Sequence, residues 1–288
     1  MKLSETIFFA NINFMKYVLC KKYGLLKTLF AIGSEKSGSD TLLLELGQDY
    51  CSYAFLNQQS KTFRQIRYMS YDEWEAEEKL AVILDQIKDE KVDQVIVCSA
   101  YAQALLVPQR QFKNYSLLDI FDAPAQKHFH DGIDRWQLVN AYGLPSTIYE
   151  IIEERFSPSH YLHVYTPGLK LNNGFGAADQ IEISFTTQHF RVLVKKNYQV
   201  HLAQTYAYRT PLDVVYFLLK ICYEFQLDQT HVVVIVSGLI DEDSALYLEL
   251  HNYFLNLNFS QEPAYTLPEN EHPYYYFNSL YTVAECVS

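Results

Sequence analysis

The chain has 288 residues, of which 49% are hydrophobic and 15% aromatic, with tyrosine and phenylalanine supplying most of the aromatic rings. This composition excludes an intrinsically disordered protein and leaves enough length for two lobes with a sizeable core. The net charge of −11 argues against broad nucleic-acid binding, because neutralising phosphates requires clustered lysine and arginine. The five cysteines are scattered without a CxxC motif, and Cys98 and Cys222 lie in apolar runs that are typical of buried thiols in a reducing compartment.

The first 33 residues carry a different charge from the rest of the chain. Five lysines and one glutamate give this segment +4, so the remainder carries −11 − 4 = −15. The apolar run over residues 7–20 is interrupted by two asparagines and a lysine, which fits neither a signal peptide nor a transmembrane helix. We predict a cytoplasmic protein in which residues 1–39 form an N-terminal extension that ends in a flexible joint. A terminal element packed on the first lobe, or an over-long start with translation beginning at Met15, is favoured over a membrane-surface helix.

A pattern of hairpin, helix and strand occurs twice in the sequence. Strands are predicted at residues 40–45 and 179–184, which gives an offset of 179 − 40 = 139 residues. An alternating hairpin, an amphipathic helix and an apolar strand follow each of them in the same order. The matching hairpin segments are 50–56 and 190–194, and the matching apolar strands are 95–99 and 233–237. This repetition predicts an internal duplication in which the apolar strands are covered on both faces.

The two repeated helices show different start signals. Ser70, with Glu73 three residues later, forms a capping box that predicts the start of the first helix. Thr210 followed by Pro211 predicts the start of the second helix. The apolar residues of both helices have the spacing of a single buried face. These residues are Leu80, Ile83, Leu84 and Ile87 in the first helix, and Val214, Phe217, Leu218, Ile221 and Phe225 in the second.

Further elements are predicted outside the two copies. The same helical spacing predicts helices over residues 146–156 and 243–257. An asparagine- and glycine-rich loop at 172–176 leads into the second copy. The tyrosine-rich tail over residues 273–287 is expected to pack on the second lobe.

One short segment resembles a known nucleotide-binding element. Residues Leu44-Glu45-Leu46-Gly47-Gln48-Asp49-Tyr50-Cys51 are similar to the first phosphate hairpin of the actin, sugar-kinase and Hsp70 superfamily. This resemblance implies an α/β fold: a two-lobed, actin-like ATPase fold with two ribonuclease H-like subdomains that clasp ATP between them. It implies a first lobe over residues 40–165 and a second lobe over residues 166–288.

The chain after about residue 40 is also similar to a bacteroidete family of unknown function, DUF3822, which has an actin-like ATPase fold. The similarity rests on short motifs that are spread along the whole chain. These motifs are Val107-Pro108 and residues 140–145, 206–216, 237–240 and 274–286.

The superfamily's nucleotide-binding positions are only partly retained. Gly47 is kept in the first hairpin, and Glu45 stands where the family has the aspartate that steers hydrated Mg²⁺. The second phosphate hairpin needs glycines that let the backbone close around phosphate, but residues 184–190 contain neither glycine nor carboxylate. The Gly-Gly pair that binds adenosine is reduced to Gly238. We therefore interpret Glu45, Gly47 and Gly238 as a vestigial nucleotide site and assign no catalytic residue.

These observations favour a degenerate, pseudo-ATPase scaffold that has lost ATP hydrolysis and needs no cofactor. Side chains such as Tyr50 and Phe185 would fill the cleft, and an outer surface near the tyrosines at 274–276 would bind an unknown protein partner. A homodimer is one form that such a scaffold can take. The alternative is an ATP-dependent kinase or ATPase that uses ATP and Mg²⁺ with non-standard phosphate loops.

A metal-assisted hydrolase is a third and weaker hypothesis. His128 and His130 alternate in sequence, so on a strand they would share a face, as metal ligands can. No third ligand cluster is visible, and a polar loop is the preferred interpretation of this segment, so we predict no metal site.

Overall fold

The computed structural model describes residues 26–33, 40–121, 123, 125–171 and 179–287. Three segments named in the sequence predictions lie outside the described residues: the N-terminal extension up to residue 25, the joint at 34–39 and the loop at 172–176.

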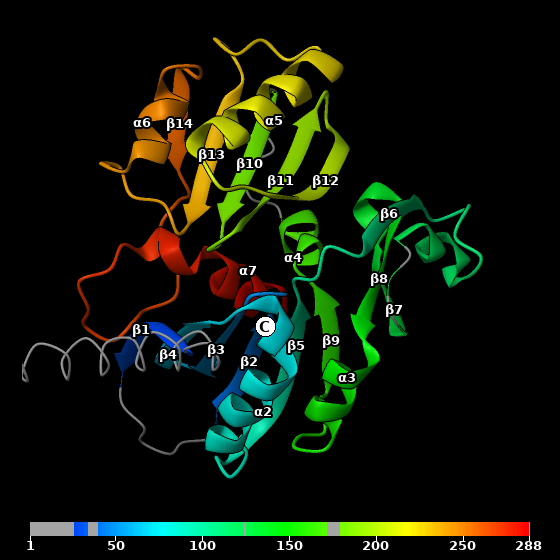
Figure 1. The fold of residues 1–288 in the computed structure, drawn as a ribbon, viewed down its shortest axis with the longest axis vertical. Helices are drawn as coiled ribbons and strands as arrows, with labels where there is room; N and C mark the ends of the chain where they lie inside the picture. The colour runs from blue at the N-terminus through cyan, green and yellow to red at the C-terminus, as the bar shows by residue number, and fades with distance from the viewer. Residues whose placement is uncertain (1–25, 34–39, 122, 124, 172–178, 288) are drawn as a thin grey trace, which may run out of the picture.

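A six-stranded sheet forms the centre of the first lobe (Figure 1). Its strands lie in the order β1-β4-β3-β2-β5-β9. The pairs β2–β5 and β5–β9 are parallel, whereas β1, β4 and β3 add antiparallel neighbours on the other side of β2. The bounds are β1 Lys27–Gly33, β2 Asp40–Leu46, β3 Tyr50–Asn57, β4 Thr62–Ser70, β5 Val92–Ser99 and β9 His160–His163.

A five-stranded sheet forms the centre of the second lobe, in the order β12-β11-β10-β13-β14 (Figure 1). β13 and β14 run parallel to β10, and β11 and β12 extend the sheet by antiparallel pairing. A third, three-stranded sheet in the order β6-β8-β7 stands beside the first lobe. The bounds are β10 Gln180–Phe185, β11 His189–Lys196, β12 Gln199–Ala207, β13 Val233–Gly238, β14 Asn256–Phe259, β6 Ala104–Pro108, β7 Gln126–Ile133 and β8 Leu138–Pro145.

Helices bury the apolar faces of both large sheets. α2 and α3 cover one face of the six-stranded sheet and α7 covers the other, whereas α5 and α6 cover a single face of the five-stranded sheet. Their bounds are α2 Ala76–Ile87, α3 Ser146–Glu153, α4 Tyr165–Lys170, α5 Pro211–Glu224, α6 Ala245–His251 and α7 Asn278–Val287. Short 3₁₀ helices are η1 Glu73–Glu75, η2 Tyr115–Phe121, η3 Asp134–Trp136 and η4 Tyr274–Phe277. Within the described part of the chain, no helix is both long and apolar enough to cross a membrane.

The two lobes repeat the same order of elements with the same pairing. In the first lobe β2 pairs antiparallel with β3 and parallel with β5, and α2 connects the hairpin to β5. In the second lobe β10 pairs in the same way with β11 and β13, and α5 makes the connection. The predicted strands and hairpins are therefore confirmed. An origin of the two lobes by duplication stays a prediction.

The helix starts were predicted with mixed success. Thr210 is the N-cap of α5, where its hydroxyl accepts from the backbone N–H of Asp213 in a full capping box. The prediction that Ser70 caps the first helix was wrong, because Ser70 is the last residue of β4. The next residue, Tyr71, donates its backbone N–H to the carbonyl of Asp49, which holds the chain extended. The α-helix then starts only at Ala76, after the 3₁₀ turn η1.

The helix predicted over residues 243–257 is shorter in the structure. Ser244 caps it by accepting the backbone N–H of Tyr247, and α6 ends at His251. Leu257 is indeed buried, but as part of the strand β14. Because β14 pairs with β13, it satisfies backbone hydrogen-bonding groups that would otherwise lie unpaired at that edge of the sheet.

The C-terminal tail contacts both lobes, so the prediction that it packs on the second lobe holds for its first part only: the Tyr275 ring stacks on Phe259 of β14, whereas α7 packs on the first lobe. Phe277, Leu280 and Tyr281 are buried in the same cluster as Leu43 of β2 and Ile96 of β5. These strand residues form the face of the six-stranded sheet that α2 and α3 leave open. Covering that face removes apolar surface from water, which is the reason for the return of the chain to the first lobe.

Candidate functional site

The candidate site lies where the β2–β3 hairpin of the first lobe meets the β10–β11 hairpin of the second. Glu45 lies opposite Ser52 in the first hairpin, and Ser184 lies opposite Arg191 in the second. The offset of 139 residues maps 45 onto 184 and 52 onto 191, so these four residues occupy equivalent places in the two hairpins.

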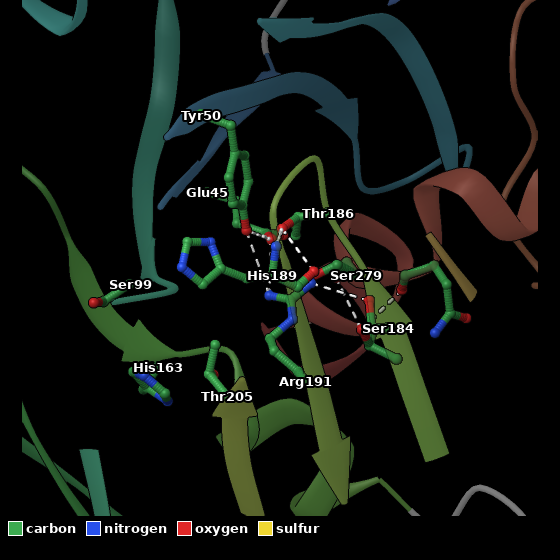
Figure 2. A network of polar contacts seen from close by, with 12 residues as sticks. Glu45, Tyr50, Ser99, His163, Ser184, Thr186, His189, Arg191, Thr205 and Ser279 are labelled. Carbon is green, nitrogen blue, oxygen red and sulfur yellow. Dashed lines mark hydrogen bonds and ion pairs between the residues drawn. The ribbon is translucent and has the colours of Figure 1, made fainter. Parts of the chain in front are cut away.

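Glu45 and Arg191 form an ion pair between the two hairpins, shown at the centre of Figure 2. The Arg191 Nη1 atom lies 3.0 Å from Glu45 Oε1, and the two side chains are only 10% and 4% exposed. The Tyr50 hydroxyl donates to the same carboxylate oxygen at 2.5 Å. On its other side, Arg191 Nη2 donates to Ser184 Oγ at 3.1 Å. The carboxylate therefore already has a cationic partner and a phenol partner.

The positive charge of Arg191 is stabilised by this arrangement. Burial alone would lower the pKa of Arg191, but the neighbouring Tyr50 and Glu45 outweigh burial and raise the pKa, so the guanidinium stays protonated. Burial, followed by the charge of Glu45, raises the pKa of Tyr50, so the phenol keeps its proton and acts as a donor. Removing one partner of a buried ion pair strongly destabilises the folded protein, because the other charge is left buried without a partner.

The space left between the hairpins is small. A cavity of about 20 Å³ remains there, and Glu45, Ser184 and Gly238 lie on its wall together with Tyr276 and Phe277. About 10–15 Å³ is enough for one water molecule, whereas sites for small-molecule ligands usually measure about 300–1,000 Å³. The cavity therefore has room for a single water molecule.

The tips of the two hairpins also contact each other directly. The Thr187 hydroxyl donates to Asp49 Oδ2 at 2.6 Å, and His189 Nδ1 lies 3.5 Å from Asp49 Oδ1. Asp49 is only 2% exposed. These contacts hold the tips of the first and second hairpins together.

Both retained glycines lie in close contact with other protein atoms. A Cβ atom on Gly47 would lie 2.2 Å from the Tyr50 ring, and the Gly47 N–H already donates to the Tyr50 carbonyl. Gly238 has a φ of +79°, and a Cβ atom there would lie 2.1 Å from the Phe185 carbonyl oxygen. Both glycines are therefore required by the packing of this chain on itself.

The family is shown by a sequence match that spans most of this structure. A family model described as "Protein of unknown function (DUF3822)" matches residues 32–257. The chain belongs to this family. No match was found among curated proteins.

Solved structures similar to this DUF3822 protein have an actin-like fold. A Bacteroides thetaiotaomicron VPI-5482 protein, described as having an actin-like ATPase fold and unknown function, superposes with a TM-score of 0.71 and 15% identity. The alignment covers 87% of this chain and 97% of that one. A structure described as the PilM-PilN type IV pilus biogenesis complex gives a TM-score of 0.59 and 9% identity, covering 86% and 97% of the two chains. The predicted two-lobed, actin-like α/β fold is confirmed.

The structure brings together only some of the site residues predicted for this DUF3822 chain. Glu45 and Gly238 line the same small cavity, whereas Gly47 lies in the hairpin turn outside it. Tyr50 does lie against Glu45, as expected of a side chain that fills the cleft. Phe185 lies at the edge of the cavity, but its ring mainly packs in the core beneath α5.

Arg191 was not predicted as a site residue. The repeat could have identified Arg191, because the 139-residue offset aligns it in the second hairpin with Ser52 in the first. A single basic residue facing the acidic Glu45 of the other copy is a pattern that could have predicted the pair.

The two histidines of the metal hypothesis lie on a strand and not in a polar loop. His128 and His130 belong to β7, and Tyr115 donates to or accepts from His130 Nδ1 at 2.7 Å. The Tyr115 ring also lies 5.3 Å from that of His128. Among the residues that the structure describes, no three histidine, cysteine, aspartate or glutamate side chains are grouped to hold a metal ion.

Proposed function

We propose that this protein is a pseudo-ATPase: an actin-like scaffold that does not hydrolyse ATP and that acts by binding a protein partner. The observation that carries the proposal is the ion pair between Glu45 and Arg191, which occupies the space between the two hairpins. In the superfamily that the sequence resembles, this is the region that receives the phosphates of ATP.

Nucleotide binding would have to displace this ion pair. The carboxylate that would steer hydrated Mg²⁺ already contacts a guanidinium and a phenol. Breaking a buried pair costs about 3–5 kcal/mol, which corresponds to a loss of roughly 10²-fold or more in affinity. A cavity of about 20 Å³ would in addition need to expand by more than tenfold to reach the volume of a usual ligand site.

Exposed apolar side chains support the protein-binding half of the proposal. Leu212, Tyr216 and Tyr223 on α5 are 60%, 61% and 83% exposed. They are spaced i, i+4 and i+11, so they lie along one side of the helix. Grouped apolar side chains on an outer surface are typical of protein interaction sites. The fold is also shared with a protein whose structure was solved as the PilM-PilN complex.

Steady-state ATP hydrolysis tests the proposal against an ATP-dependent enzyme. The purified chain and its Glu45→Ala variant would be incubated with ATP, with and without Mg²⁺, while phosphate release is followed. The proposal predicts that neither protein exceeds the protein-free rate. Mg²⁺-dependent turnover that is lost in Glu45→Ala would instead support a kinase or ATPase in which Glu45 steers the metal.

A further inference from the structure

The two faces of the five-stranded sheet differ in their cover. On one face, Val233 and Ile235 of β13 line a cavity of about 580 Å³, so the prediction that the apolar strands are covered on both faces fails for β13. On the other face, α5 buries Val214, Leu218 and Ile221 against the sheet. α5 therefore belongs to the outer layer of the second lobe (Figure 1), and its outward side faces solvent.

This outward side is more apolar than that of α2, the equivalent helix in the first lobe. A helix at the surface normally presents polar and charged residues to water. α2 follows this rule at four of its five exposed positions, whereas α5 breaks it at three of five. The exposed residues are Glu77, Glu78, Val82, Asp85 and Gln86 in α2, and Leu212, Tyr216, Lys220, Tyr223 and Glu224 in α5.

The apolar residues on the outward side of α5 have the spacing of a coiled coil. Leu212, Tyr216, Leu219 and Tyr223 follow one another at intervals of four, three and four residues. Leu219 is half-buried and the other three are exposed. Side chains at these intervals occupy a and d positions, which interlock with the side chains of a second helix. This apolar seam, made of these four residues, is therefore suited to another α-helix.

Two opposite charges flank the seam on one edge. Asp213 and Lys220 lie seven residues apart, so both occupy the same position of the heptad. The Asp213 carboxylate accepts the backbone N–H groups of Arg209 and Thr210, which lower its pKa and keep it ionised. Lys220 forms no ion pair within the part of the chain that the structure describes.

This arrangement of charge fits α5 of a second copy. When two identical helices pack antiparallel, the same edge of each helix meets, so Asp213 of each copy would lie beside Lys220 of the other. A parallel pair would bring this edge against the opposite edge of the second helix. The residues of that opposite edge, Val215 and Cys222, are buried in the core of their own lobe. The charges therefore favour an antiparallel pair.

We propose that the outward side of α5 joins two copies of this chain through an antiparallel, two-fold symmetric helix contact. The inference rests on the proposed function, because it names the partner of the apolar α5 surface. Leu212 would face Tyr223 of the second copy, and Tyr216 would face Leu219 of the second copy. One pair of helices buries less than the about 1,200–2,000 Å² of a standard interface, so we expect a reversible dimer with a Kd of roughly 1–100 µM.

Sedimentation equilibrium of the purified full chain tests this contact. Across concentrations from about 1 to 300 µM, the mean mass should rise from the monomer value of 33.6 kDa toward twice that value. Tyr216→Glu/Tyr223→Glu should weaken dimerisation by at least about a hundredfold, because the two-fold axis places four charges in the contact. Both tyrosines are exposed in the single chain, so the substitutions should leave its unfolding transition unchanged.

Matched controls separate the seam from a general effect of apolar or charged residues. Trp74→Glu/Ile120→Glu makes the same kind of change at two side chains of the first lobe that are 70% and 71% exposed, and it should dimerise as the unmodified chain does. Lys220→Glu should weaken dimerisation by about tenfold, because it replaces two attractive pairs with two repulsive ones. The same reversal at the exposed Lys91 of the first lobe should have no effect.

The outcomes distinguish this inference from the proposed function. A mass that stays at the monomer value at every concentration, or equal dimerisation of the seam variant and its first-lobe control, would overturn the antiparallel dimer. Phosphate release measured on the same samples reports on the pseudo-ATPase separately. A monomer without ATP turnover would overturn the dimer alone, and a dimer with Mg²⁺-dependent turnover would support the contact while contradicting the pseudo-ATPase.

Discussion

The Arg191 guanidinium contacts the Glu45 carboxylate at 3.0 Å, although 146 positions separate the two residues in the sequence. Each residue comes from the hairpin of a different lobe, so the ion pair joins the two lobes. In the proposed function, this ion pair takes the place of bound phosphates between the hairpins.

The ion pair makes a direct prediction about stability. Arg191→Met should lower the free energy of unfolding by about 3–5 kcal/mol, because it leaves the Glu45 carboxylate buried without a cationic partner. The double variant Glu45→Gln/Arg191→Met should be less destabilised than the two single variants added together. Urea unfolding followed by circular dichroism measures both values.

Lys220→Met on the exposed side of α5 serves as the control for this series. A surface substitution of this kind should change the free energy of unfolding by less than about 0.5 kcal/mol. If Arg191→Met were as mild as this control, the ion pair would have no role in closing the hairpins.

The conformation of Gly238 predicts that alanine is poorly tolerated there. Its φ of +79° disfavours an L side chain, and the added Cβ would lie 2.1 Å from a backbone oxygen of Phe185. We expect Gly238→Ala to lower the free energy of unfolding by about 1–3 kcal/mol. Gly168→Ala in α4 is the matched control, because the nearest atom to its Cβ lies 3.9 Å away. Equal thermal midpoints for the two variants would show that position 238 does not require glycine.

A buried histidine predicts a loss of stability in acid. The backbone N–H of Tyr165 donates to His163 Nδ1, and Nε2 lies 2.9 Å from the Tyr101 carbonyl, so the neutral ring with its proton on Nε2 fits the site. Burial lowers the pKa of His163 to about 3, from an ordinary value of 6.5. Between these two values the unfolded chain binds a proton that the folded chain does not, so stability falls as the pH falls from 6.5 toward 3.

Comparison with His163→Gln isolates this contribution. The histidine contributes at most about 1.4 kcal/mol per pH unit to the slope of the free energy of unfolding against pH, and this contribution should be absent from the variant. Urea unfolding at several values between pH 6.5 and pH 4 gives the slope for each protein. Identical slopes would show that His163 is not held neutral in the folded chain.

Local patterns predicted much of the fold. The apolar spacing at Leu80, Ile83 and Leu84 identified the buried face of α2, because helical periodicity is contained in neighbouring residues. Thr210 capped α5 as predicted for the same reason. Ser70 failed as a cap because a contact outside its own segment, from Tyr71 to Asp49, keeps the chain extended past it.

The candidate site is formed by contacts between residues far apart in the sequence, which local patterns do not predict. Glu45 was identified as a site residue, but its partner Arg191 lies in the other lobe. The packing of α7 on the first lobe was missed for a similar reason: its apolar residues fit either sheet, and only the open face beside Leu43 decides between them. Contacts between the lobes can be identified only from the three-dimensional structure, whereas local sequence patterns are enough to predict many of the helices and strands.

Thermal unfolding in the presence of nucleotides tests the proposal that the closed hairpins do not admit a nucleotide. The purified chain would be unfolded with millimolar ATP, ADP or AMP-PNP, each with and without Mg²⁺. A ligand present at a hundred times its dissociation constant adds about 2.7 kcal/mol, or roughly 5 °C, to the stability of a protein of this size. We predict no shift with any nucleotide. A Mg²⁺-dependent rise of several degrees would contradict the proposed function.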